Sequence, residues 1–309
     1  MTKIRSTDGS HIDDRRGQGG SGGGSSGGFP FQIPGMGGSS GGGGGFPIPG
    51  GMKGGGGILG IIVLLAAVFL PKLLGAGGGT PSQAADVNSA SSGQPGKCVT
   101  ELEQIVCGVT NDVQIYWAEA LPQYFNTQYE VTETVWFTGG VSTGCGQASS
   151  ETGPFYCPAD HLVYIDLEFM QQLEEQLIGQ PTDLAEQYIL AHEYGHHIQN
   201  ILGDNARVQQ AQQNDPERAN QYSVALELQA DCYAGAWVGA RDVLDSPDEL
   251  DEAIAAAEGV GDDRIQQRTQ GRVDPESWTH GSAEQRKTWF LTGYNSADPS
   301  QCDTFAEIQ

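Results

Sequence analysis

Basic residues are scarce in this chain, and closely spaced cysteine pairs are absent. Of its 309 residues only 15 are Lys or Arg, against 39 Asp or Glu, and the formal net charge is −24. The phosphates of nucleic acids repel an acidic surface of this kind, which excludes a nucleic-acid partner. The chain has six cysteines but no C-x-x-C pair, which argues against a zinc-thiolate knuckle.

Long apolar runs are equally rare, and the sequence contains one. Residues 58–70 are apolar apart from Gly60, and Pro71 and Lys72 precede two further leucines. Crossing a bilayer needs ~20 apolar residues, but the flanking glycines and the long Lys72 side chain can lie at the interface. A cleaved signal peptide is the alternative, but its charged leader is short, and here more than fifty residues come first. We therefore predict a retained transmembrane helix over residues 58–75.

Of the 46 glycines, 28 lie in the first 80 residues, and this uneven distribution divides the chain into segments. Residues 1–57 contain too few apolar side chains to offset the chain entropy lost on folding, which predicts a disordered tail. Residues 76–97 are expected to form a flexible linker, and residues 98–309 a folded domain. Lys53 and other basic residues precede the apolar run, and none lies in residues 75–96. The positive-inside rule then predicts a single-pass cell-membrane protein with a cytoplasmic N-terminus and an extracytoplasmic domain.

All six cysteines lie after residue 90. An even number of cysteines on one side of an apolar segment indicates an oxidising compartment, in agreement with the charge argument. Cys98–Cys107 and Cys145–Cys157 are candidate local disulfides, which would leave Cys232–Cys302 as the third. Spacing alone does not choose among the 15 possible connectivities.

The domain is predicted to have an α+β fold that is mostly helical, with a small strand region. Runs of β-branched and aromatic residues predict strands over 132–137 and 162–167. The expected helices cover 111–123, 183–202, about 221–244, a segment that begins at Ser246–Pro247, and 282–294. The helix 183–202 has the clearest boundaries, because Asp183 and Glu186 can form a capping box and Gly203 can end the helix.

The strongest chemical signal is the sequence His192-Glu193-Tyr194-Gly195-His196 within this helix. Residues four apart lie on one helical face, so both imidazoles can reach one Zn²⁺ ion. Glu193 can reach a water molecule on that ion without binding the metal itself, and it is the predicted general base. An H-E-x-x-H sequence also occurs by chance, but the apolar neighbours indicate burial, and two buried histidines without a partner would be costly.

His197 follows the motif directly. It points about 100° away from His196 around the helix, and we interpret it as a structural residue.

A catalytic zinc ion takes a third protein ligand, which has to come from another element. Glu227 is the best candidate, in the sequence Glu227-Leu228-Gln229-Ala230-Asp231. Asp231, on the same helical face, is predicted to accept a hydrogen bond from a ligand histidine and so fix its tautomer. The alternative is an amphipathic helix with two solvated acids, but the surrounding residues are largely apolar or small and indicate burial on several sides.

These motifs resemble the zincin peptidases whose third ligand is a glutamate, and more closely the bacterial neutral zinc metallopeptidase family. The similar segments follow one another along nearly the whole chain: Asp13-Asp14-Arg15-Arg16-Gly17, Cys145-Gly146, Gly153 to Pro158, Val163 to Leu167, His192 to Gln199, Ala230 to Gly235, Gln285-Arg286 with Trp289-Phe290, and Cys302 to Phe305. The resemblance implies a zincin-like domain that hydrolyses peptide bonds and binds one Zn²⁺ per chain through His192, His196 and Glu227.

We therefore expect a membrane-anchored zinc peptidase, specifically an endopeptidase, that acts on peptide or protein substrates. Tyr194, Tyr233 and His280 are candidates for stabilising the oxyanion, although His280 also fits a structural role. The strand 162–167 precedes the metal-binding helix and is a candidate edge strand for pairing with an extended peptide. Two other functions fit the sequence: a non-catalytic, zinc-stabilised binding protein, and a zinc amidase that acts on cell-wall peptides.

Overall fold

The computed structural model describes residues 3–17 and 93–308, apart from residues 178, 180, 181, 242 and 247. The predicted transmembrane helix 58–75, with most of the predicted tail and linker, lies outside the described residues. The predicted membrane attachment therefore stays a prediction. Within the described ranges, no helix has both the length and the apolar character that a membrane span requires.

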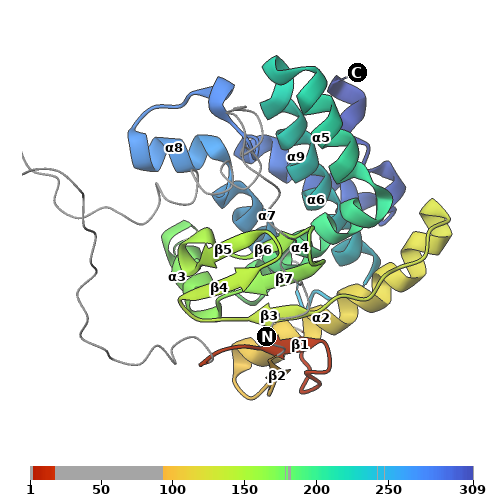
Figure 1. The fold of residues 1–309 in the computed structure, drawn as a ribbon, viewed down its shortest axis with the longest axis vertical. Helices are drawn as coiled ribbons and strands as arrows, with labels where there is room; N and C mark the ends of the chain where they lie inside the picture. Colours follow the sequence, from red (N-terminus) through yellow and green to blue (C-terminus); the bar gives the residue numbers. More distant parts are fainter. Residues whose placement is uncertain are drawn as a thin grey trace, which may run out of the picture.

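Helices dominate the described residues, and two small sheets lie beside them (Figure 1). The α-helices are α2 (Glu101–Ala120), α3 (Leu167–Leu177), α4 (Asp183–Leu202), α5 (Asp204–Asn214), α6 (Ala219–Ala240), α7 (Asp248–Gly259), α8 (Asp262–Gln270) and α9 (Ala283–Ser296). The strands are β1 (Ile12–Asp14), β2 (Gln94–Pro95), β3 (Thr134–Trp136), β4 (Gly140–Thr143), β5 (Gly146–Ser149), β6 (Phe155–Cys157) and β7 (Leu162–Ile165). The predicted mostly helical α+β class is confirmed.

The larger sheet has five strands in the order β2-β1-β3-β7-β6, and β4 and β5 form a separate hairpin. The three central strands run parallel to one another, whereas β2 and β6 are antiparallel to their neighbours at the two edges. The predicted strand 162–167 ends at Ile165, because Asp166 accepts a hydrogen bond from the N–H of Phe169 and caps α3. The prediction that this strand is an edge strand is wrong, because β3 and β6 occupy both of its sides.

The N-terminal residues 3–17 belong to the same folded body as the cysteine-bearing domain. Strand β1 pairs with β2 and β3, and Ile12 is 3% exposed in the hydrophobic core. The predicted disordered tail is therefore wrong for these residues, because backbone pairing and the burial of Ile12 offset the entropy of ordering them. The predicted cytoplasmic location of the N-terminus stays a prediction, as does the membrane span on which it depends.

Close contacts between helices bring α4, α6 and α9 together. A Cβ atom on Gly195 of α4 would lie 3.0 Å from the Cα atom of Ala230 of α6. A Cβ atom on Gly293 of α9 would lie 1.9 Å from the carbonyl oxygen of Cys232. Because glycine has no side chain at these points, the middle of α4 faces the middle of α6.

The helix boundaries follow from capping groups. Helix α4 has the predicted bounds, but Thr182 rather than Asp183 caps it, since the Thr182 side chain accepts a hydrogen bond from the N–H of Ala185. Gly203 ends the helix with a φ of 81°. Helix α2 begins well before the predicted residue 111, because Thr100 and Glu103 form a capping box.

Three disulfides join the candidate cysteine pairs, Cys98–Cys107, Cys145–Cys157 and Cys232–Cys302. The third disulfide links the C-terminal segment to α6, because Cys232 lies in α6 shortly after Glu227. Disulfides persist in oxidising compartments, so these three indicate an extracytoplasmic domain.

Candidate metal centre

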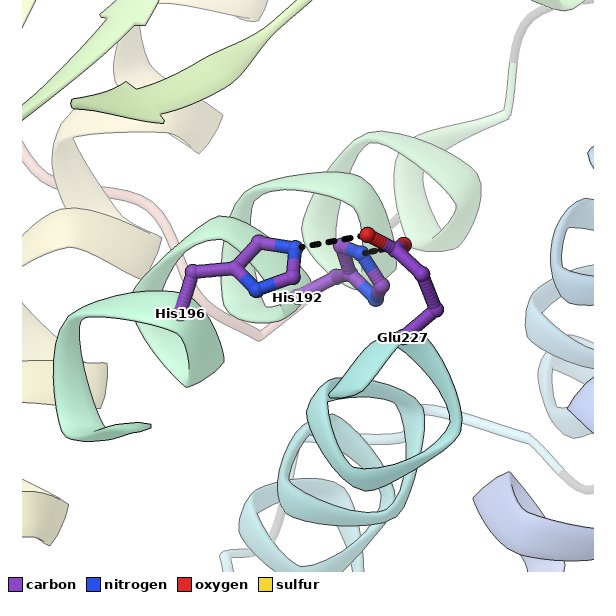
Figure 2. Close-up of side chains that lie close together, drawn as sticks. All are labelled: His192, His196 and Glu227. Carbon is purple, nitrogen blue, oxygen red and sulfur yellow. Dashed lines mark hydrogen bonds and ion pairs between the residues drawn. The ribbon is translucent and has the colours of Figure 1, made fainter. Parts of the chain in front are cut away.

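His192 and His196 lie on one face of α4, and Glu227 faces them from α6 (Figure 2). One potential ligand atom from each residue lies within 4.8 Å of the others. The Nε2 atom of His192 is 3.2 Å from Oε2 of Glu227, and Nε2 of His196 is 3.6 Å from Oε1. The packing of two helices thus brings together the three residues predicted as metal ligands.

The three groups fit a zinc ion in both chemistry and spacing. Imidazole nitrogen and carboxylate oxygen bind zinc at ~2.0–2.2 Å, so two ligand atoms of a tetrahedral ion are about 3.4 Å apart. The distances of 3.2 and 3.6 Å between imidazole and carboxylate atoms lie on either side of this value. The side chains of His196 and Glu227 are 19% and 21% exposed, so the centre is accessible from solvent. A catalytic zinc ion needs such access, because its fourth position takes water or substrate.

Asp231 contacts the side of the His192 ring that faces away from Glu227. Its Oδ1 atom is 2.8 Å from Nδ1 of His192, which leaves Nε2 directed at Glu227. Arg286 of α9 forms a two-point ion pair with Asp231, at 2.7 Å from Nε to Oδ2 and 2.8 Å from Nη2 to Oδ1. The Tyr188 hydroxyl donates a fourth hydrogen bond to the same carboxylate at 2.5 Å. The Asp231 role predicted from spacing fits this geometry, whereas Arg286 and Tyr188 were not predicted.

Gln199 holds His196 in the corresponding way. Its Oε1 atom is 2.9 Å from Nδ1 of His196, and its Nε2 atom donates to the carbonyl of Leu226 and to Oε1 of Gln229. In both candidate ligand histidines, Nδ1 therefore faces a buried partner. The three-residue spacing of His196 and Gln199 on one helix was a signal for this contact in the sequence.

Glu193 lies next to His192 on α4 and is 8% exposed. Burial raises the pKa of Glu193 to about 7, and the charge of Glu227 adds to the rise. The charge of His192 and a hydrogen bond from the backbone N–H of Tyr156 act in the opposite direction. A carboxyl group with this pKa exchanges protons readily near neutral pH, as a general base and acid must.

The ligand groups influence one another strongly. Burial lowers the pKa of His192, but its hydrogen bond to Asp231 and the charge of that group outweigh burial and raise the pKa to about 10. Burial would raise the pKa of Glu227, but the charges of His196 and His192 hold it well below its usual value. The Nε2 atom of His192 faces the Glu227 carboxylate at 3.2 Å, so the proton on this nitrogen in a charged imidazole points at that carboxylate. Metal binding would displace that proton.

Comparison with known proteins agrees with this candidate site. The model of the family described as "Putative neutral zinc metallopeptidase" matches residues 1–305. The chain belongs to this family. It is 42% identical over 303 residues to the uncharacterized protein YpfJ of Escherichia coli strain K12, with 96% of each chain covered. It is 46% identical over 213 residues to the uncharacterized protein Rv2575 of Mycobacterium tuberculosis strain H37Rv, with 65% of this chain and 70% of the relative covered. No solved structure matches the chain.

In this member of the neutral zinc metallopeptidase family, the loop before α9 holds His280 near Glu227 of the candidate metal centre. Asp262 accepts hydrogen bonds from the backbone N–H groups of Thr279, His280 and Gly281, and its Oδ1 atom is 3.2 Å from Nδ1 of His280. Burial lowers the pKa of His280, but Asp262 and the nearby charge of Glu227 outweigh burial, so the pKa is raised. His280 is thus fixed through Nδ1 and lies close enough to Glu227 to respond to its charge.

The two candidate tyrosines lie elsewhere. Tyr233 is buried in the core with its ring against Trp117, and it follows Glu227 by six residues, about 9 Å further along α6. The hydroxyl of Tyr194 is 3.1 Å from the hydroxyl of Thr134 on β3, on the sheet side of α4. Neither placement fits the predicted oxyanion role, and both tyrosines are part of the core.

His197 is fully buried, and both of its ring nitrogens have partners. Nδ1 is 3.1 Å from the Tyr156 hydroxyl, and Nε2 is 2.7 Å from the carbonyl of Glu130. These contacts fit the predicted structural role and join α4 to the sheet.

Proposed function

We propose that this protein is a zinc-dependent endopeptidase. The observation that carries the proposal is the convergence of His192, His196 and Glu227, with Glu193 beside them on the same helix. The family match supports peptide hydrolysis as the reaction. A protein that used zinc only for folding would have no need of a buried acid at position 193 outside the ligand set, since burying a carboxyl group is costly.

A bound Zn²⁺ ion supplies Lewis acidity, which polarises the scissile carbonyl and lowers the pKa of a water molecule. Asp231 and Gln199 orient the two histidines for binding that ion through Nε2. Glu193 accepts a proton from the attacking water and then transfers it to the leaving amine. His280, whose Nδ1 atom is held by Asp262, donates a hydrogen bond from Nε2 to the developing oxyanion.

We assign the peptide-binding edge to β6 in place of β7. Strand β6 is the last strand in the sheet order, and the backbone N–H of Tyr156 in β6 donates a hydrogen bond to Glu193. An extended peptide that paired beside this strand would lie next to the proposed general base. Backbone pairing would give affinity with little demand on the side chains of the substrate.

The Glu193→Gln variant tests the proposed reaction. Glutamine keeps the size of the side chain but cannot accept the water proton, so the variant should bind zinc at the wild-type stoichiometry and lose cleavage of unfolded casein by at least ~10²-fold. The matched control is Glu284→Gln at an exposed position of α9, which should cleave at the wild-type rate. Cleavage by Glu193→Gln at the wild-type rate would rule out this mechanism.

The substrate class is tested with the same preparations. The full chain should cleave unfolded protein, and a chelator should abolish the cleavage. Cleavage of cell-wall peptide fragments alone would identify the protein as an amidase, and zinc binding without any hydrolysis would identify it as a binding protein.

A further inference from the structure

A short N-terminal strand lies inside the larger sheet, although residues 15–93 separate it from the next strand in the sequence. Strand β1 lies between β2 and β3, with Asp13 opposite Pro95 and Ile12 opposite Thr134. Ile12 and Asp13 are only 3% and 7% exposed. Such burial on both sides is typical of an interior strand of a core.

Arginines of the same segment have their partners in the disulfide-bonded domain. The guanidinium of Arg5 is 2.5 Å from Glu101, and that of Arg16 is 2.8 Å from Glu103. Arg16 also lies over the ring of Trp136, at 4.5 Å from its centroid. Basic residues before an apolar run ordinarily indicate a cytoplasmic flank. In the folded chain, however, these two arginines are paired with groups of the domain.

The domain has glycines where the N-terminal segment crosses it closely. A Cβ atom on Gly108, in the interior of α2, would lie 2.9 Å from the Cα atom of Arg5. A Cβ atom on Gly96 would lie 2.5 Å from Cγ2 of Ile12. Glycine within a helix is less favourable than alanine. At Gly108 it leaves room for the backbone of Arg5, which a larger residue would block. The N-terminal segment and the domain therefore pack closely at both glycines.

We propose that residues 3–17 lie on the same side of any membrane as the disulfide-bonded domain, which differs from the cytoplasmic N-terminus predicted from the distribution of basic residues. Strands cannot form hydrogen bonds across a bilayer. The described residues on either side of residues 18–92 are also in contact, because the N–H of Gly93 donates a hydrogen bond to Oδ1 of Asp13 at 2.5 Å. A chain that leaves one folded body and rejoins it at the same place returns to the side of a membrane from which it started. This inference is independent of the proposed peptidase activity.

Thiol labelling of the full-length chain in spheroplasts tests the proposal. Ser10→Cys and Glu284→Cys each place a cysteine at an exposed position, one in the N-terminal segment and one in α9. Both should react with a membrane-impermeant maleimide to the same extent, and permeabilisation should change both alike. Labelling of Glu284→Cys in intact spheroplasts, with Ser10→Cys labelled only after permeabilisation, would overturn the proposal.

A stability measurement on the full chain gives a second test. Ile12→Asp should lower the Tm of the domain by roughly 5–10 °C, because it buries a charge in the core between β2 and β3. Ser10→Asp, at an exposed position two residues earlier, should leave the Tm unchanged. Equal Tm values for Ile12→Asp and the wild-type chain would show that β1 is not part of the folded domain.

Discussion

At the scale of single residues, a buried ion pair supports the candidate metal ligands. Asp231 is completely buried, and it accepts hydrogen bonds from His192, Arg286 and Tyr188. A buried carboxylate loses several kcal/mol of solvation, and the Arg286 guanidinium compensates that loss at two points. The ring of His192 is therefore oriented by protein groups before any metal ion binds.

The Arg286→Gln variant tests this support. Removing the guanidinium leaves the Asp231 charge buried without its partner, which should lower the free energy of unfolding by about 3–5 kcal/mol. Loss of the orientation of His192 should weaken zinc binding by roughly 10–100-fold. Thermal unfolding and zinc titration measure the two effects, with the exposed Arg272→Gln as the control. Unchanged zinc affinity in a folded Arg286→Gln variant would remove Arg286 from the metal centre.

Sequence spacing was sufficient to predict which site residues on the same helix lie together. It was insufficient to predict contacts between residues on different helices. Four-residue spacing grouped His192 with His196 and Glu227 with Asp231, and the structure places both pairs at one point. The partner of Asp231 comes from α9, 55 residues later in the sequence. No local pattern indicates which distant cation neutralises a buried acid, so Arg286 could be recognised only from the fold.

At the scale of elements, α3 and α4 share a pair of buried carboxyl groups outside the metal centre. Glu174 and Glu186 are 1% and 4% exposed. Burial, and then the charge of Glu186, raise the pKa of Glu174 to about 9, while burial and the charge of Asp183 raise the pKa of Glu186 to about 8. Both groups are therefore mostly protonated at neutral pH in the folded protein.

Because the pKa values of both carboxyl groups are raised, we expect the free energy of unfolding to fall as the pH rises. The unfolded chain releases these protons near pH 4.3 and the folded chain near pH 8–9, so the folded state binds more protons in between. The stabilisation is complete below about pH 4.3 and is lost as the pH rises through the folded pKa values.

Glu174→Gln should reduce this dependence and raise the Tm at pH 8 by a few degrees, because glutamine stays neutral at every pH. The exposed neighbour Glu175→Gln is the matched control and should keep the wild-type dependence. Calorimetry between pH 5 and pH 9 measures both. A Tm of Glu174→Gln that falls with pH as steeply as that of the wild-type chain would contradict the assignment.

The elements that the sequence indicated well are those with strong local signals. Helix α4 has a threonine N-cap, a C-terminal glycine and an apolar pattern, and its bounds were predicted correctly. Strand β1 is the three-residue sequence Ile-Asp-Asp, which has no alternation to detect. Its position depends on long-range pairing with β3 and on burial of Ile12 beside β2. Only the assembled sheet shows that the glycine-rich N-terminal region begins with an ordered strand.

At the scale of the whole molecule, three disulfides cross-link the described part of the chain, and one of them starts from α6, which carries Glu227. Cys232–Cys302 closes a loop with a sequence separation of 70, whereas Cys98–Cys107 and Cys145–Cys157 have separations of 9 and 12. The entropy that a disulfide removes from the unfolded chain grows with loop length. The long bridge therefore contributes most to holding the C-terminal segment on α6.

Replacing Cys232 and Cys302 together by alanine should lower the free energy of unfolding by about 4 kcal/mol, and replacing Cys145 and Cys157 by about 3 kcal/mol. Urea unfolding of the two double variants measures the difference. A smaller loss for the Cys232/Cys302 variant than for the local pair would contradict the chain-entropy argument.

The zinc content of the purified chain tests the central claim most directly, namely that α4 and α6 hold one ion between His192, His196 and Glu227. Elemental analysis should give one zinc per wild-type chain and one per Glu193→Gln chain. Glu227→Ala should retain less than roughly a tenth of that content, because two imidazoles alone are an incomplete zinc site. Full zinc occupancy in a folded Glu227→Ala variant would contradict the account.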